Sequence, residues 1–201
     1  MSYRSLAEAR KDAAHCRDCP LWKHATQTVF GEGRESARIV LVGEQPGDQE
    51  DLAGKPFVGP AGRLLDRALA DAAIDRKATY VTNAVKHFKF ELRGKRRLHK
   101  KPGQLEINAC HQWLEAELTL IRPAVVVALG ATAARAVFGR ATAIEKNRGH
   151  IIRAAQAHLA HESDVLVTVH PSFLLRVPDE DRDEAYGRFV DDLKLIRRYA
   201  S

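Results

Sequence analysis

The chain has 201 residues and a formal net charge of +6, with 45% hydrophobic and 29% charged residues. This is the composition of a globular protein with enough apolar residues for one core, and we expect a single domain over residues 1–201. No apolar run approaches the roughly 18 residues of a membrane span, and the first residues lack the apolar core of a signal peptide. The sequence therefore predicts a cytoplasmic protein without membrane contact.

Four short, continuously apolar runs predict buried parallel strands: Arg38–Val42, Thr79–Thr82, Ala124–Leu129 and Val165–Val169. Amphipathic helical patterns alternate with them: Gly62–Ala73, Leu105–Ile121, Ala131–Phe138 and Glu184–Tyr199. This alternation predicts an α/β fold, a three-layer αβα sandwich around a central, mainly parallel four-stranded sheet. Residues 149–153 have the pattern of a further short strand.

Polar side chains gather where three of these strands end. Glu44, Gln45 and Asp48 follow the first strand, Asn83 the second, and His170 and Ser172 the last. Alone, Asn83 is a common turn residue and His170 a common structural histidine. Because parallel strands bring their carboxyl ends to one edge, where open α/β sheets bind ligands, we expect a functional site there. The third strand ends in Gly130-Ala131-Thr132, which favours packing or helix capping.

A dense basic segment follows the second strand. It holds eight cations and the single acid Glu91; the cations are Lys86, Lys89, Arg93, Lys95, Arg96, Arg97, Lys100 and Lys101. Such a run can be a solvated loop, but its density favours a surface that follows phosphates.

Three cysteines form the last candidate group. Cys16 and Cys19 make a C-x-x-C pair, and Cys110 lies far downstream. The odd number argues against a disulfide framework, and the third cysteine favours a metal centre over a redox pair.

In this order and spacing, four motifs resemble the uracil-DNA glycosylase superfamily, in particular its iron–sulfur family 4 and the covalently trapping UdgX type. They are Gly43-Glu44-Gln45-Pro46-Gly47-Asp48, Pro56-Phe57-Val58-Gly59-Pro60-Ala61-Gly62, Val81-Thr82-Asn83, and His170-Pro171-Ser172 with Leu174-Leu175-Arg176. The resemblance runs from about Cys16 to the C-terminal helix.

The resemblance implies that Phe57 stacks on an extruded uracil, Asn83 pairs with its polar edge, and Gln45, beside Gly43, contacts its carbonyls. It also implies that His170 stabilises the leaving uracil anion. Ser172 and Arg176 would hold DNA phosphates, although Ser172 has an equally good explanation as a helix N-cap. Glu44 and Asp48 are candidates to stabilise the sugar cation, and we prefer Glu44.

The segment Gly94-Lys95-Arg96-Arg97-Leu98-His99 is similar to the signature loop of the UdgX type, with Leu98 where isoleucine is usual. The resemblance implies that His99 becomes bonded to the deoxyribose after uracil leaves. We expect Arg97 to fix the loop through a salt link or a phosphate, and Lys95 and Arg96 to be general phosphate contacts. The alternative is that His99 only lines a phosphate-binding loop.

The resemblance further implies a [4Fe-4S] cluster on Cys16, Cys19 and Cys110. His87 takes the position where family 4 has its fourth cysteine. A structural zinc ion on the same Cys3His set is the alternative.

We therefore expect a monomeric, single-turnover uracil-DNA glycosylase acting on single- or double-stranded uracil-containing DNA. Two alternatives remain open: a conventional multiple-turnover family-4 enzyme, and a non-catalytic uracil-DNA-binding protein.

Overall fold

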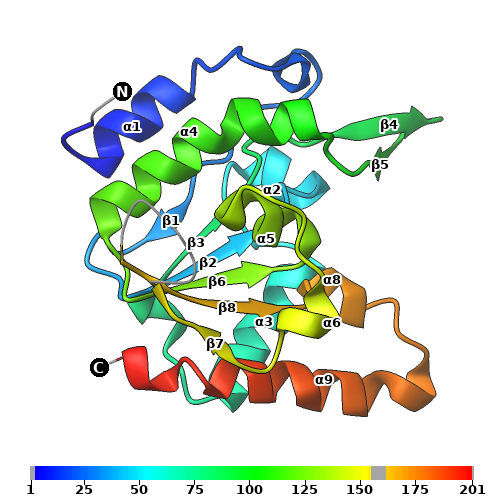
Figure 1. Ribbon diagram of the computed structural model, residues 1–201. Coiled ribbons are helices and arrows are strands. Elements are labelled where there is room, and N and C mark those ends of the chain that lie inside the picture. The colour runs from blue at the N-terminus through cyan, green and yellow to red at the C-terminus, as the bar shows by residue number, and fades with distance from the viewer. Residues whose placement is uncertain (1–2, 155–161, 201) are drawn as a thin grey trace.

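The computed structural model describes residues 3–154 and 162–200. Its centre is a sheet of order β1-β3-β2-β6-β8-β7 between two layers of helices (Figure 1). The four inner strands, β2 (Ile39–Gly43), β3 (Thr79–Asn83), β6 (Val125–Leu129) and β8 (Asp164–Thr168), are parallel to one another. The predicted αβα fold with a mainly parallel sheet is confirmed.

The sheet has six strands rather than the four that we predicted, because two short strands pair with its edges. β1 (Glu32–Gly33) is antiparallel to β3, and β7 (Ile151–Ile152) is antiparallel to β8. The second lies inside the range 149–153 predicted as a further strand. A two-residue strand carries no periodicity, which is why β1 gave no signal in the sequence.

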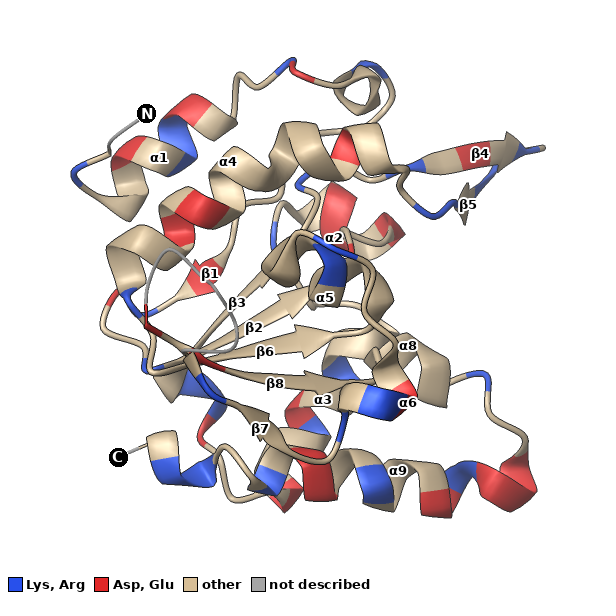
Figure 2. Cartoon of the chain, viewed as in Figure 1, with Lys and Arg blue, Asp and Glu red and all other residues tan. Residues whose placement is uncertain are grey.

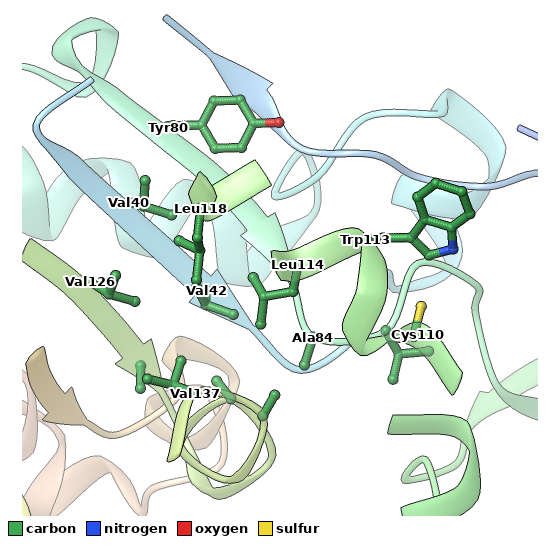
Figure 3. Packing of buried hydrophobic residues seen from close by; sticks show 14 of the residues in the cluster. Val40, Val42, Tyr80, Ala84, Cys110, Trp113, Leu114, Leu118, Val126 and Val137 are labelled. Carbon is green, nitrogen blue, oxygen red and sulfur yellow. The ribbon is translucent and has the colours of Figure 1, made fainter. Parts of the chain in front are cut away.

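Each inner strand is buried on both faces, so its side chains alternate between two cores. Val40 and Val42 face the core beneath α1 (Leu6–Ala13), α4 (Gln104–Ile121) and α5 (Ala131–Phe138), part of which is drawn in Figure 3. Ile39 and Leu41 face the core beneath α3 (Pro60–Asp71) and α9 (Asp179–Lys194). This is the reason for the continuously apolar strand sequences.

Short elements complete the fold, and several of them surround the carboxyl edge of the sheet. They are α2 (Asp48–Ala53), α6 (Ile144–Asn147), α8 (Pro171–Leu174) and the 3₁₀ turns Pro20–Lys23, Arg76–Ala78 and Arg197–Tyr199. The last turn continues from α9, so the predicted helix over 184–199 ends at Lys194 and is followed by this turn. None of the helices in the described ranges is long and apolar enough to cross a membrane.

The basic segment forms a β-hairpin, although the sequence suggested a loop. β4 (Phe90–Arg93) and β5 (Arg96–His99) pair antiparallel and project from the body of the protein at the carboxyl edge of the main sheet (Figure 1). We call this element the basic hairpin. Lys86 is not part of that surface, because its side chain is fully buried. The prediction that Lys86 belongs to a phosphate-binding surface is therefore wrong.

Candidate active site

A cavity of about 950 Å³ opens at the carboxyl edge of the sheet. It has the size of a small-molecule site, which is enough for a nucleobase and its sugar. The strand ends supply most of its chemistry, and the basic hairpin and α8 close its sides. Its lining includes Glu44, Gln45, Asp48, Phe57, Asn83, His99, His170, Ser172 and Arg176. The structure thus brings together most of the predicted site residues.

Phe57 and Asn83 line the cavity, and Gly43 lies directly against both side chains. A Cβ atom on Gly43 would overlap Asn83 Oδ1 and the Phe57 ring, so only glycine fits there. Phe57 has a φ of 57°, and its carbonyl lies where a side chain on Gly62 would be. Within the described residues, the Asn83 carboxamide has no hydrogen-bond partner, although Asn83 is buried. An amide so placed can pair with a ligand that has both a donor and an acceptor.

The His170 ring forms a wall beside Phe57, with ring centroids 6.0 Å apart. Its Nδ1 accepts the backbone N–H of Ser172 at 3.1 Å and lies 2.8 Å from the Ser172 hydroxyl. Because a backbone N–H can only donate, Nδ1 is unprotonated and Nε2 carries the proton of the neutral ring. Nε2 is buried and has no partner among the described residues.

Burial lowers the pKa of His170 to about 4, which the neighbouring Glu44 carboxylate only partly offsets. The ring is therefore neutral at physiological pH and presents an N–H donor to the cavity. His170, not Ser172, is the N-cap of α8. The helix-cap explanation for Ser172 is thus wrong, and its contacts orient the His170 ring instead.

Glu44 lies between two hydrogen-bond donors. Its Oε1 is 3.3 Å from Nε2 of His99, and its Oε2 accepts the Thr132 hydroxyl. Desolvation raises the pKa of Glu44, but the His99 and Thr132 hydrogen bonds and the charges of His99 and His170 outweigh it and hold that pKa below its ordinary value. Glu44 is thus a fixed carboxylate. The sequence had favoured packing or capping for the Gly130-Ala131-Thr132 turn, and nothing in it pointed to this contact.

Arg97 fastens the basic hairpin to α2. Its guanidinium bonds Asp48 at 2.5 Å and the fully buried Asp51 at 2.6 Å. It also lies over the rings of Phe88 and Phe90, at 5.5 and 5.1 Å from their centroids. These contacts set the position of β5, whose last residue is His99.

Gln45 fastens the other end of the hairpin. Its Nε2 donates to the carbonyls of Lys89 and Lys100 at 3.1 Å each, and its Oε1 accepts the Lys89 N–H at 3.2 Å. The carboxamide is thus committed to the two chain segments that enter and leave the hairpin. Only the Gln45 backbone remains available to a ligand.

The three cysteines lie in one region, between α1 and α4. Cys16 and Cys19 pack against the core that contains Cys110 and Trp113. Within the described residues, no group of three or more His, Cys, Asp or Glu side chains is close enough to hold a single metal ion. Two N–H groups nevertheless point at sulfur atoms, Trp113 Nε1 at Cys16 Sγ (3.2 Å) and the Lys86 backbone N–H at Cys110 Sγ (3.1 Å).

His87 lies beside the same region, with a defined tautomer. The Thr28 hydroxyl donates to the Ala13 carbonyl at 2.9 Å, so it accepts the Nε2–H of His87, also at 2.9 Å. The lone pair of the ring is therefore on Nδ1. Burial lowers the pKa of His87, which keeps the ring neutral, as a metal ligand must be.

Comparison with known proteins defines the class of this fold and site. Residues 30–194 match the family model of the uracil DNA glycosylase superfamily. The chain therefore belongs to the uracil-DNA glycosylase superfamily.

Several curated relatives are similar over most of their length. A type-4 uracil-DNA glycosylase of Thermotoga maritima is 41% identical over 162 residues, which are 80% of this chain and 78% of the relative. One from Archaeoglobus fulgidus is 35% identical over 178 residues, 87% and 85% of the two chains. A type-5 uracil-DNA glycosylase of Pyrobaculum aerophilum is 30% identical over 190 residues, 86% of this chain and 75% of the relative.

Proposed function

We propose that this protein excises uracil from DNA and then keeps the deoxyribose bonded to His99. One observation carries the second half of this proposal: His99 lies on the cavity wall with its Nε2 3.3 Å from the Glu44 carboxylate. In the proposed complex the sugar of the bound nucleotide would lie beside this histidine, with the Glu44 carboxylate as the neighbouring base. The curated type-4 relatives support the first half.

The cavity lining fits recognition of an extruded base. Phe57 would stack on uracil, and the unpartnered Asn83 carboxamide would accept from N3–H and donate to O4. Cytosine has an amino group in place of O4 and no proton on N3, so it would leave the buried Asn83 amide unpaired. An unpaired buried amide costs about 1–3 kcal/mol, which favours uracil. The backbone N–H groups after Gly43 can meet the other uracil oxygen.

Bond cleavage would begin with the C1′–N1 bond, whose electron pair leaves with uracil. The neutral His170 ring would donate its Nε2 proton in a hydrogen bond to O2, where the negative charge develops. Glu44 would face the cationic sugar and stabilise it. Asp48 would act indirectly, because it holds Arg97 and through it the basic hairpin. Arg176, at the rim of the cavity, would contact a phosphate, and Ser172 would assist through His170.

His99 would then complete the reaction. A ring nitrogen gives its lone pair to C1′, and the ring proton passes to Glu44 and on to solvent. Uracil takes its proton from solvent, so the products are an N-glycosylated imidazole and free uracil. Fixed placement of the ring gives it a large kinetic advantage over water. The product is neutral and a poor leaving group, so each protein molecule reacts once.

We also propose that Cys16, Cys19, His87 through Nδ1 and Cys110 hold a [4Fe-4S] cluster. The N–H groups aimed at two sulfur atoms support this, because such donors are the partners that cluster thiolates take. A cubane also spaces its ligands more widely than a single ion such as zinc does. When bound, the cluster would cross-link the N-terminal segment to α4 and to the chain after β3. Metal analysis of the purified protein decides between the two metals. Iron with acid-labile sulfide would support the cluster, and zinc would contradict it.

The covalent step is tested by mixing the protein with a uracil-containing oligonucleotide and running a denaturing gel. Wild type and His111→Ala, a histidine exposed on α4 away from the cavity, should shift completely, while thymine-containing DNA should give no shift. His99→Ala should lose the shift and release uracil slowly, because water then attacks beside Glu44.

Other outcomes would decide against the covalent step. Many equivalents of uracil per protein without any shift would establish a conventional multiple-turnover glycosylase. Tight uracil-DNA binding without base release would establish a non-catalytic protein. A full shift with His99→Ala would show that His99 is not the nucleophile.

A further inference from the structure

The tip of the basic hairpin carries three cations in four residues, Arg93, Lys95 and Arg96 around Gly94 (Figure 2). All three are exposed, and none has an acidic partner within the described part of the chain. The cations nearer the base are paired: Lys100 with Glu91, Lys89 with Glu106, and Arg97 with Asp48 and Asp51. Among the described residues of the basic segment, the cations without an acidic partner are thus the three at the tip and Lys101, which lines the cavity.

The strand register makes this arrangement unfavourable in the free protein. Arg93 lies directly opposite Arg96 in the ladder, and like charges in such a pair repel. The two-residue turn between them, with Gly94 at φ 60°, is tight and adds Lys95 to the same end. Repulsion between like charges at one position is expected where a negatively charged ligand neutralises them.

The tip has a fixed relation to the cavity. Gln45 fastens the base of the hairpin, Arg97 fastens β5 beside the tip, and His99 at the end of β5 reaches Glu44 in the cavity. Arg96 is three residues from His99 along an extended strand, which is a distance of about 10 Å. A DNA strand in B-form carries one phosphate per 3.4 Å or so of axis, so this distance corresponds to about three phosphates.

Leu92 adds an apolar contact on the other face of the hairpin. It pairs with Arg97, on the face that His99 shares, and its side chain is 69% exposed. On this face His99 reaches Glu44 in the cavity, whereas Arg93 and Arg96 share the opposite face of the hairpin. The hairpin therefore carries Leu92 and His99 on one face and the two tip arginines on the other.

We propose that the tip of the basic hairpin is a phosphate clamp that grips one DNA strand about three nucleotides from the extruded uridine, on one side of it. The partner is the polyanionic backbone, recognised by charge and not by base sequence. This rests on the proposed function, since it places the uridine sugar beside His99.

The test measures DNA affinity as a function of salt, using an oligonucleotide with 2′-fluoro-deoxyuridine, whose fluorine destabilises the sugar cation and prevents base release. Arg93→Ala/Lys95→Ala/Arg96→Ala is compared with the control Arg34→Ala/Lys77→Ala/Arg197→Ala. The control removes the same charge from the opposite, amino edge of the sheet.

Each phosphate contact contributes about 0.7 to 0.9 to the slope of log K against log salt concentration, so the tip variant should lose about 2 to 3 units of slope. Between about 50 and 200 mM salt its affinity should then fall roughly 20- to 40-fold less than that of wild type or control. Shortening the DNA to one nucleotide on one side of the uridine should abolish this difference, whereas shortening the other side should not.

A tip variant with the slope of wild type would overturn the clamp, and so would an equal loss of slope in the control. Because the analogue is not cleaved, these results are independent of covalent capture, which the denaturing gel measures separately. Unfolding midpoints confirm that the variants are folded. The tip variant should be no less stable than wild type, since it removes the repulsion between Arg93 and Arg96.

Discussion

At the level of single residues, burial of His170 has a consequence for stability as well as for chemistry. Its pKa is about 4 in the folded protein, against an ordinary value of 6.5. Between these values the unfolded chain binds more protons than the folded one, so stability falls as the pH decreases through this window. We expect a loss of about 2 kcal/mol between about pH 7 and pH 5 from this group alone.

His170→Asn should remove that loss, because asparagine does not titrate. Urea unfolding at several pH values checks it, and measurements above about pH 5 avoid Glu44, whose pKa is lowered and whose contribution is lost only in more acidic solution. An unchanged pH dependence in the variant would contradict the burial argument.

Lys86 illustrates how tertiary structure can reverse a sequence interpretation. Its buried ammonium donates to Glu117, Thr82 and the Asn83 carbonyl, at 2.6, 2.6 and 2.8 Å, so all three N–H bonds have acceptors. Lys86→Met should destabilise the fold by about 3–5 kcal/mol, because Glu117 stays buried without its cation. Chemical denaturation of Lys86→Met and of Lys86→Met/Glu117→Gln checks this. The double variant should regain most of the loss; equal losses in both would refute the pairing argument.

Strand-end logic located Glu44, Asn83 and His170 from sequence, because their positions follow from chain direction in a parallel sheet. Strand direction could not show that the Gln45 carboxamide hydrogen-bonds the backbone at the base of the hairpin, or that the Thr132 hydroxyl donates to Glu44. Those contacts join positions far apart in the chain, and no local pattern encodes them.

At the scale of elements, the two strands of the basic hairpin were not predicted, because the segment is dominated by charged residues. Phe90 to Arg93 alternates apolar and charged residues, and Gly94-Lys95 is a two-residue turn, but the dense cations were interpreted as a phosphate-following surface or a solvated loop, and no strand was predicted there. The four inner strands were predictable because both of their faces are buried. The hairpin has no such burial, and its position depends on individual polar contacts.

Arg97 should therefore control where His99 lies. Arg97→Met removes both carboxylate contacts, and a displacement of about 1 Å can slow a positioned reaction on the order of 100-fold. We expect adduct formation to slow by roughly 10- to 100-fold, with uracil release much less affected. Rapid-quench kinetics of both products, with Arg34→Met as control, measure this. Parallel slowing of both would show that Arg97 acts on base excision and not on His99.

At the scale of the whole molecule, α1 packs on the core beneath α4, and the chain after α1 carries Cys16 and Cys19, two of the proposed cluster ligands. Removal of the proposed cluster by a chelator, or Cys110→Ala, should leave the main sheet folded and open residues 14–28 to protease. Limited proteolysis with mapping of the cut sites checks this. Cleavage spread over the sheet, or none at all, would contradict it. Leu105→Ala, an exposed residue of α4, is the matched control.

Charge is also divided across the molecule. The acids of α2 are used internally, on Arg97 and on backbone N–H groups, so they do not oppose a polyanion at the cavity. The unpaired cations of the hairpin tip lie at the same edge. The cavity edge is thus suited to DNA although the net charge of the chain is only +6.

The most direct test of covalent capture is the intact mass of the protein after reaction with a uracil-containing oligonucleotide. We predict the mass of protein plus oligonucleotide minus uracil, with the bond mapped to His99. A Schiff base with Lys101, which also lines the cavity, would have the same mass. Borohydride distinguishes the two, since it adds two hydrogens to a Schiff base and leaves a histidine glycoside unchanged. An unmodified protein mass alongside released uracil would contradict the account, and so would an adduct that borohydride reduces.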